Sequence, residues 1–295
     1  MTGRERHIAL SAGVFLAPAL LLIAVFFFLP VAAALLLSFT DFDIYALGDL
    51  DRLRLVGLNN YIQLLQSPLF WTALGNTGYF VLVGGPLSVA ISLGAALLVN
   101  ARVTRFPGFF RTVFFLPVVT TLVAVAVVWR YLYQPRYGLL NYGLSLLGID
   151  PIDWLGDPDW AMPAIILMAV WKNFGFNMII FVAGLQNIPT HLYEAARIDG
   201  ANGWRRFRYI TLPLLGPTFL FVALMTMIGY FQVFAEPYVM TQGGPANRTL
   251  SVVLLMYEEG FRWWNMGYAS AAAFLLFVLI LAGTVLQLQL RRGEE

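Results

Sequence analysis

Six polar side chains interrupt two segments of this chain that are otherwise apolar. They are Lys172, Asn173 and Asn177 in "WKNFGFNM", and Tyr230, Gln232 and Glu236 in "MIGYFQVFAEPY". Asn173 and Asn177 are four residues apart and therefore share one face if their segment is helical. A polar group in hydrocarbon costs several kcal/mol when it lacks a partner, so such side chains turn towards the interior of a helix bundle. Their types predict hydrogen bonds to a polar solute that crosses the bundle.

The chemistry of these side chains leaves two interpretations open. Amides, hydroxyls and aromatic faces suit a sugar, which needs many hydrogen bonds and stacking on the apolar side of its ring. The same groups can instead bond to neighbouring helices or to a partner membrane protein. Lys172 can also extend to the membrane surface or pair with Glu236, and a basic residue at mid-depth keeps a phosphorylated polyol such as glycerol phosphate as an alternative solute. A sugar fits the whole set better.

The sequence offers few candidates for catalytic or metal-binding residues. Cysteine is absent, and His7 and His191 are the only histidines, which excludes a thiol nucleophile and makes a histidine-rich metal site unexpected. The G-x-S-x-G nucleophile elbow is missing, and so is the G-x-x-x-x-G-K-[ST] phosphate loop. We therefore expect no bound metal, no enzyme activity and no ATP site in this chain.

The segments that position these residues are long enough to cross a membrane. Hydrophobic residues make up 60% of the 295 residues and charged residues only 12%, a composition that indicates a bilayer as solvent. A membrane-crossing helix needs about 20 apolar residues. The first apolar segment is too long for a signal peptide and lacks a cleavage site. The sequence predicts an all-α membrane protein with six spans, at roughly 11–37, 74–99, 112–133, 161–185, 211–234 and 266–290.

The arginines predict the orientation of these spans. Eleven of them fall on one side of the six-span arrangement and six on the other. Because cytoplasmic loops carry the excess of Lys and Arg, the first side is the cytoplasm and both termini lie inside. The cytoplasmic set is Arg4, Arg6, Arg102, Arg105, Arg111, Arg197, Arg205, Arg206, Arg208, Arg291 and Arg292. The outer set is Arg52, Arg54, Arg130, Arg136, Arg248 and Arg262.

The third outer loop contains "TQGGPANRTL". Gly243, Gly244 and Pro245 predict a tight turn there, since glycine and proline punctuate chains in this way. Such a loop either connects two helices or faces a soluble partner.

A charged segment on the cytoplasmic side stands out from this apolar chain. The stretch "EAARIDGANGWRRFRYITLPLL", residues 194–215, carries six charges. Thr190 predicts the N-cap of a short helix, Glu194 and Arg197 can pair on its surface, and Gly200 ends it. A second amphipathic piece follows, with Trp204, Phe207 and Ile210 on its apolar face, and Pro213 begins the next span. By physics alone this segment is an interfacial helix with arginines at lipid phosphates.

The same segment carries a family resemblance. Its pattern is Glu194-Ala195-Ala196, then Gly200 after three residues, Ile210 after nine and Leu212-Pro213 after one. This pattern resembles the EAA motif of ABC-transporter permease subunits. The flanks "GLQNIPTHLYEAARIDGA" (184–201) and "TLPLLGP" (211–217) are similar to carbohydrate-uptake permeases of the maltose and glycerol 3-phosphate type. Looser matches such as "SFTDF" (38–42), "VGLNNYIQLL" (56–65) and "MGYASA" (266–271) extend the resemblance over nearly the whole chain.

The resemblance implies a type I ABC importer permease fold. Residues 1–70 then hold the first span and its outer loop, residues 71–290 the permease core and residues 291–295 a cytoplasmic tail. A coupling helix at about 190–210 is implied to dock into a cytoplasmic ATPase. The implied ATPase contacts are Glu194, Ala195, Ala196, Arg197, Asp199, Gly200, Ala201, Arg205, Arg206, Ile210, Leu212 and Pro213.

The implied partners are a second homologous permease, two ATP-binding subunits that hold ATP and magnesium, an extracytoplasmic solute-binding protein and the lipid of the cell membrane. Nucleic acid is not expected, because the net charge is only +2. The main alternative function is an ion-coupled secondary transporter or a channel, and an intramembrane enzyme is a third. Neither Asp nor Glu lies at mid-span and no clear repeat is visible, which argues against the secondary transporter.

Overall fold

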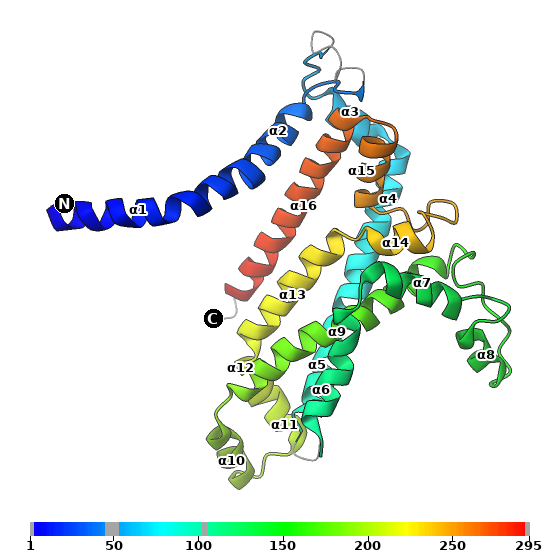
Figure 1. The fold of residues 1–295 in the computed structure, drawn as a ribbon. Coiled ribbons are helices and arrows are strands. Elements are labelled where there is room, and N and C mark those ends of the chain that lie inside the picture. The colour runs from blue at the N-terminus through cyan, green and yellow to red at the C-terminus, as the bar shows by residue number, and fades with distance from the viewer. Residues whose placement is uncertain (1–2, 45–52, 102–104, 293–295) are drawn as a thin grey trace. The chain divides into compact units, whose positions relative to one another are not determined.

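The computed structural model describes residues 3–44, 53–101 and 105–292, with side chains from residue 12 to residue 289 within these ranges (Figure 1). These residues are almost entirely helical, and their β structure is limited to one isolated bridge between Thr40 and Leu55. Of the arginines used to predict orientation, Arg52 and Arg102 lie outside the described residues. The side chains of Arg4, Arg6, Arg291 and Arg292 do so as well.

Among the described residues, four helices are long and apolar enough to cross a membrane: Ala12–Leu37, Pro68–Val99, Ala161–Gln186 and Met266–Gln289. Two further candidates are bent pairs of helices. Pro107–Val119 meets Leu122–Leu132 at 98°, and Gly203–Leu214 meets Gly216–Phe231 at 67°. The chain is thus a multi-pass membrane protein. The helices predicted over 112–133 and 211–234 are therefore not continuous, because each of these regions contains a bend.

The break in the third predicted span follows from its residues. Pro117 lies inside helix α6 (Pro107–Val119) and has no N–H to donate. The β-branched Thr120 and Thr121 that follow have extended backbones, with ψ of 148° and 137°. The Thr120 hydroxyl donates to the carbonyl oxygen of Pro117 at 2.6 Å, which satisfies one acceptor that the interrupted helix leaves open.

The fifth predicted span is bent near its predicted start. Helix α11 (Gly203–Arg206) continues through a wide π-helical turn, Phe207–Thr211, into α12 (Leu212–Leu214). Pro213 therefore lies within this continuous stretch and does not begin the span. The chain bends at Leu215, and α13 (Gly216–Phe231) starts with Pro217 in its first turn, where a missing N–H costs nothing.

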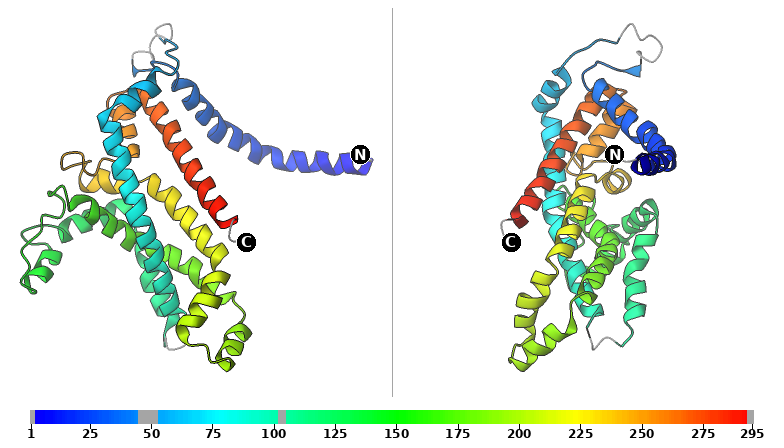
Figure 2. Two further views of the ribbon diagram at one scale, coloured as in Figure 1. Left: turned by 180° about the vertical axis from the view of Figure 1, so that it is seen from behind. Right: turned by 90° about the vertical axis from the view of Figure 1, so that its left-hand side faces the viewer.

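The chain divides into two compact units. The larger comprises Pro68–Leu255 with Leu276–Glu295, and the smaller comprises Met1–Ser67 with Met256–Leu275. The larger unit is built on α9 (Ala161–Gln186), which α5 (Gly85–Val99), α6 and α13 all contact (Figures 1 and 2). The α6–α9 contact depends on Gly175, since a Cβ there would collide with the carbonyl oxygen of Phe114. Its remaining helices are α4 (Pro68–Tyr79), α7 (Leu122–Leu132), α8 (Leu139–Ser145), α10 (Thr190–Ile198) and α14 (Ala235–Met240), together with most of α15 (Val252–Tyr257).

The smaller unit contains α1 (Gly3–Ile23), α2 (Leu29–Leu37), α3 (Asn59–Gln66) and the first turns of α16 (Met266–Arg292). Asn60 of α3 is buried and its side-chain amide donates to the carbonyl oxygens of Ser38 and Thr40, each at 2.8 Å. Gly267 at the start of α16 lies against the Thr40 carbonyl. These contacts join the end of α2 to α3 and α16.

Candidate functional site

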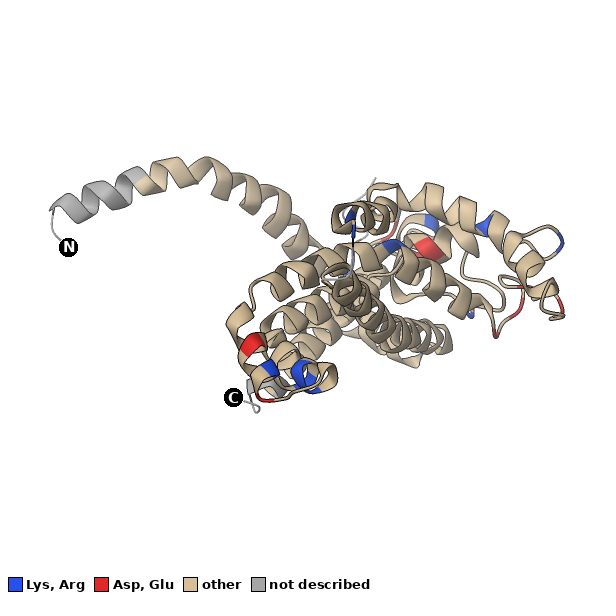
Figure 3. Ribbon diagram, turned by 90° about the horizontal axis from the view of Figure 1, so that it is seen from below, with Lys and Arg blue, Asp and Glu red and all other residues tan. Residues whose placement is uncertain are grey.

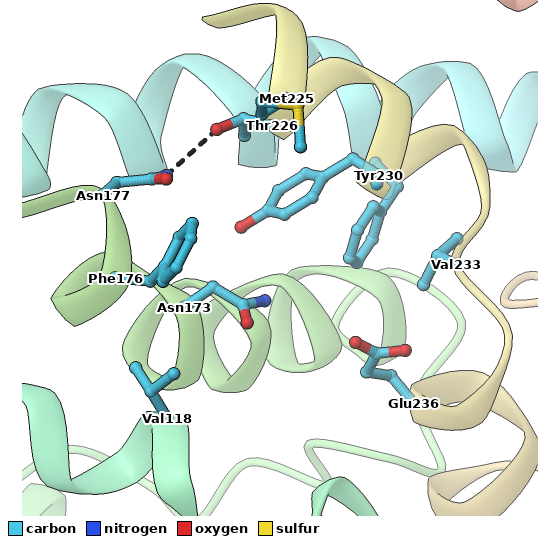
Figure 4. A pocket seen from close by; sticks show the side chains of 11 residues that line it. Val118, Asn173, Phe176, Asn177, Met225, Thr226, Tyr230, Val233 and Glu236 are labelled. Atoms are coloured by element: carbon cyan, nitrogen blue, oxygen red, sulfur yellow. Dashed lines mark hydrogen bonds between the residues drawn. The ribbon is translucent and has the colours of Figure 1, made fainter. Parts of the chain in front are cut away.

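A cavity of about 330 Å³ lies in the larger unit between α6, α9, α13, α14 and the π-helical turn Phe80–Gly84 (Figure 4). Most of its wall comes from α9 and from the C-terminal half of α13. Its lining residues are Phe80, Val118, Asn173, Phe176, Asn177, Met225, Thr226, Gly229, Tyr230, Val233 and Glu236. The wall therefore combines aromatic and aliphatic surface with amide, hydroxyl and carboxylate groups.

The structure brings together four of the six polar residues singled out in the sequence. Asn173, Asn177, Tyr230 and Glu236 all line the cavity, although they come from three different helices. Asn173 and Asn177 face it together, as expected for residues one helical turn apart. Lys172 and Gln232 do not line it.

Lys172 is buried and binds backbone. Its Nζ donates to the carbonyl oxygens of Pro117 and Val118, at 3.2 and 3.3 Å. These carbonyls belong to the last turn of α6, where helical partners are missing and a positive charge is favoured. No ion pair within 4.0 Å joins Lys172 to Glu236, both of which the structure describes. The ammonium group therefore supports the interrupted helix.

Gln232 lies just after the end of α13, with an exposed side chain. Its position, two residues after Tyr230, places it on nearly the opposite side of the helix axis. Gln232 is close to Tyr230 in sequence but does not share its face. The α13 residues that line the cavity lie on one face, one helical turn apart.

Thr226 is a cavity residue that the sequence reasoning missed. Its Oγ1 accepts a hydrogen bond from the side-chain amide of Asn177 at 3.0 Å (Figure 4). This bond joins α9 to α13. The spacing in the sequence indicates this position, since Thr226 precedes Tyr230 by four residues in an apolar helix and must share its face.

Tyr230 presents a hydroxyl group to the cavity (Figure 4). Its ring packs against Phe80, with centroids 4.9 Å apart, and against Gly84, where an added Cβ would lie 3.0 Å from the ring edge. The hydroxyl is buried and lies near the side chains of Ser88 and Asn173, although neither forms a hydrogen bond of good geometry with it. A buried hydroxyl gains from a well-placed partner, so this position favours a solute that can bond to it.

Glu236 is the acidic residue of the cavity. It lies in the first turn of α14 and only 9% of its surface is exposed. Helix α14 packs against α7 and α9, which holds the residue in place. The carboxylate points into the space beside Asn173 and Val233 (Figure 4).

A second site is the charged segment that follows α9. Helix α10 ends in a Schellman motif, in which Gly200 N–H bonds to Arg197 O at 3.1 Å and Ala201 N–H bonds to Ala196 O at 2.8 Å. Gly200 has φ of +75°, as this motif requires. Thr190 is the first residue of the helix and its side chain makes no cap, so its prediction as N-cap is wrong. Glu194 and Arg197 do not form the expected ion pair within 4.0 Å.

Helix α11 has a cap that the sequence reasoning missed. The Asn202 side-chain oxygen accepts from Arg205 N–H at 2.8 Å, a regular N-cap. Phe207 and Ile210 are half-buried, whereas Trp204 is 67% exposed and touches Phe207 at a centroid distance of 5.6 Å. The predicted apolar face is therefore correct for the last two residues and wrong for Trp204.

The residues of the family motif divide into exposed and anchoring positions. Ile210 and Tyr193 pack on a buried cluster that includes Leu185 and Leu215, and the Tyr193 hydroxyl lies 2.9 Å from Thr211 Oγ1. Leu212 and Ala196 are half-buried. The exposed positions are Glu194, Ala195, Arg197, Asp199, Gly200, Arg205 and Pro213, while Ala201 and Arg206 are intermediate. Figure 3 shows acidic and basic positions close together in the helices seen from below. The segment thus offers a polar outer surface on an anchored base.

The loop predicted to lie on the outer side turns at Gly243–Pro245. Gly243 has φ of +83°, the Gly244–Pro245 peptide is cis, and Gly244 N–H donates to Thr241 O at 3.0 Å. Asn76 of α4 holds the following residues by donating to Asn247 O at 2.7 Å and Leu250 O at 3.0 Å. The loop is therefore tied to the helix beneath it.

Comparison with known proteins places this fold in a family. Residues 88–294 match the model of binding-protein-dependent transport system inner membrane components. The lactose transport system permease protein LacF of Rhizobium radiobacter is 37% identical over 296 residues, covering 99% of this chain and 97% of that protein. The trehalose/maltose transport system permease protein MalF of Thermococcus litoralis is 39% identical over 240 residues, covering 80% of each.

Solved structures share the fold. A chain of a bacterial ABC transporter involved in the import of the acidic polysaccharide alginate superposes with a TM-score of 0.80 at 24% identity, covering 98% of this chain and 96% of that one. An alginate transporter in complex with a pentasaccharide-bound periplasmic protein gives 0.78 at 24% identity, with 96% and 93% covered. With the matched region spanning most of the described helices, this chain belongs to the family of binding-protein-dependent transport system inner membrane components, the permease subunits of ABC transporters.

Proposed function

We propose that this chain forms the solute pathway of an ATP-driven importer for a sugar or oligosaccharide. The observation that carries the proposal is the cavity in which Asn173, Asn177 and Tyr230 face one space beside the rings of Phe80 and Phe176. Amides and hydroxyls bind the hydroxyl groups of a saccharide, and aromatic rings stack on its apolar face. The names of the relatives, which include lactose and trehalose/maltose permeases, support the same class of solute.

The proposed topology has six spans with both termini in the cytoplasm. Each bent pair then counts as one span, which brings the four long helices to six. The excess of arginines on the side that carries α10 and α11 supports this orientation. Localisation in the cell membrane, with the turn at Gly243–Pro245 on the outer side, follows from it.

The segment from Glu194 to Pro213 is proposed to couple the pathway to a cytoplasmic ATPase. Its exposed surface is largely polar but also carries the large side chains of Ile198, Trp204 and Tyr209, which are 88%, 67% and 73% exposed. Several exposed apolar and aromatic side chains on one charged segment suit a contact with a partner protein. Because Ile210 and Tyr193 anchor the base, force on α10 is transmitted to the helices of the larger unit.

The remaining partners are proposed from the family. A second homologous permease completes the pathway, two ATP-binding subunits hold ATP and magnesium, and an extracytoplasmic solute-binding protein delivers the solute. ATP hydrolysis then takes place in a separate chain. A phosphorylated polyol is less well supported as the solute, because Lys172, which suggested it, is bound to backbone carbonyls.

Uptake by the reconstituted importer tests this proposal. The chain is assembled with its partner permease, ATPases and binding protein in vesicles, and uptake of radiolabelled lactose, maltose and trehalose is measured with and without ATP. We expect ATP-dependent uptake of at least one sugar, and a fall of about tenfold or more with Asn177→Leu, which removes an amide from the cavity. Uptake driven by an ion gradient without ATP would contradict the proposal.

A further inference from the structure

The wall of the cavity contains one acidic side chain and, among the described residues, no basic one. Glu236 lines it, and among the described residues that line it there is no lysine, arginine or histidine. The other polar groups of the wall, on Asn173, Asn177, Thr226 and Tyr230, are neutral amides and hydroxyls. A solute in the cavity therefore meets one carboxylate among neutral hydrogen-bonding groups.

The nearest candidate for a balancing charge is directed elsewhere. Lys172 lies on the same helix as Asn173, but its Nζ binds the carbonyl oxygens of Pro117 and Val118. The side chain of Val118 lines the cavity, so the ammonium group lies against the backbone of the cavity wall and does not form part of its surface. Binding of an anion to Lys172 would require it to give up both hydrogen bonds.

The carboxylate itself is free to meet a solute. No hydrogen bond from another side chain to Glu236 is formed among the described residues, and its oxygens point into the cavity beside Asn173 (Figure 4). Water is largely excluded at this depth, since only 9% of the residue is exposed. Charges interact more strongly where water is excluded, so a second negative charge placed here is repelled more than it would be at the surface.

We propose that Glu236 is a specificity-determining residue of this cavity, which accepts neutral and amino-bearing saccharides and rejects anionic ones. The inference rests on the proposed function, because it assumes that the cavity holds a saccharide. Hydroxyl and ammonium groups of the solute donate hydrogen bonds to the carboxylate. Carboxylate or phosphate groups of a uronate or a sugar phosphate cannot donate and carry the wrong charge.

Binding measured without the solute-binding protein tests this proposal, because that protein applies a selectivity of its own. The full-length chain with its partner permease is placed in lipid nanodiscs, and affinities are measured by saturation-transfer NMR. The probes are maltose, a glucosamine disaccharide and digalacturonate, which are neutral, cationic and anionic. We expect the wild type to bind the first two at least about tenfold more tightly than digalacturonate.

Three variants assign that selectivity to Glu236. Glu236→Gln keeps the shape and removes the charge, so the ratio of digalacturonate affinity to maltose affinity should rise about tenfold or more, whatever maltose loses with the carboxylate acceptor. Glu236→Asp keeps the charge and should still reject digalacturonate. Asp159→Asn removes a charge from an exposed loop outside the cavity and should change nothing.

The possible failures are distinguishable. If digalacturonate binds the wild type as tightly as maltose, and Asn177→Leu abolishes both, the cavity holds saccharides and the charge selection is wrong. If Glu236→Gln folds and binds maltose but still rejects digalacturonate, another residue sets the selectivity. If no probe binds, or Asn177→Leu leaves binding unchanged, the proposed function of the cavity is itself wrong.

Discussion

The side-chain amide of Asn177 on α9 donates a hydrogen bond of 3.0 Å to the Thr226 hydroxyl on α13, at the edge of the cavity. Both side chains are buried, and the bond links the two helices that supply most of the cavity wall. A solute that reaches Asn177 therefore meets an amide whose orientation is already set, which lowers the entropy cost of binding.

Loss of this bond should weaken both the helix contact and solute binding. Thr226→Val keeps the shape and removes the acceptor, and a double-mutant cycle with Asn177→Leu should give a coupling energy of about 0.6 kcal/mol, at most roughly 1.7 kcal/mol. Unfolding in detergent measures the stability, and the nanodisc assay measures maltose affinity, which should fall about threefold with Thr226→Val. Strictly additive effects of the two substitutions would show that the bond contributes nothing.

Lys172 should prove structural. Lys172→Met removes the ammonium donor from the Pro117 and Val118 carbonyls, of which only Pro117 O keeps another donor, the Thr120 hydroxyl, and should lower the free energy of unfolding by about 1–3 kcal/mol. Lys172→Arg retains a cation and donors and should recover part of that loss. Maltose affinity of the folded Lys172→Met protein should stay within about threefold of the wild type, because the ammonium does not line the cavity. A stable variant with greatly reduced affinity would instead identify Lys172 as a solute ligand.

Gly200 should be needed for coupling to the ATPase. Its φ of +75° is strained for a residue with a side chain, at a cost of about 1 kcal/mol, so Gly200→Val should distort the end of α10. We expect sugar-stimulated ATPase activity of the assembled importer to fall at least about fivefold while the membrane helices remain folded by circular dichroism.

Gly203 offers a matched control for Gly200. It lies three residues further on, has no positive φ, and an added Cβ would meet nothing within 4 Å. Gly203→Val should therefore leave the stimulated activity nearly unchanged. Equal losses from the two substitutions would point to bulk at the docking surface and away from the Schellman motif.

The rejection of anionic saccharides should weaken at low pH. Burial raises the pKa of the Glu236 carboxyl, although its own backbone N–H and the charge of Lys172 oppose that shift. A carboxyl with a raised pKa takes up its proton at a higher pH than an ordinary glutamate, so its negative charge is lost as the pH falls towards that value. Besides Lys172 on α9, the ionisable groups on α14 and on the helices around it are Tyr230 on α13, Tyr238 on α14, and Tyr131 and Arg130 on α7. The Arg130 guanidinium donates to Val239 O of α14 at 3.4 Å.

Digalacturonate keeps its negative charges at these pH values. A change in its affinity therefore reports a change in the protonation of the protein. Lowering the pH from neutrality towards the raised pKa of Glu236 should raise the affinity of digalacturonate for the wild type and leave its affinity for Glu236→Gln unchanged. An equal pH dependence in both proteins would assign the effect to another group.

Local patterns predicted most of the fold. The long apolar segments became helices close to their expected limits, for example Ala161–Gln186 for the predicted 161–185. The bends were missed because apolar content alone does not reveal where backbone groups lose their partners. Pro117 with Thr120 and Thr121, and Leu215 before Pro217, were visible in the sequence, but a proline in a membrane helix does not always break it.

The sequence by itself determined the apolar helices, the short helix ended by Gly200 and the family motif around it, because these depend on residues that are neighbours along the chain. Only the tertiary structure decided which polar side chains meet. Asn173 and Lys172 are adjacent in sequence, yet the first lines the cavity and the second binds the end of α6, since successive residues of a helix point about 100° apart. What each side chain meets depends on the neighbouring helices. The surroundings of Lys172, Thr226 and Glu236 were therefore decided by packing.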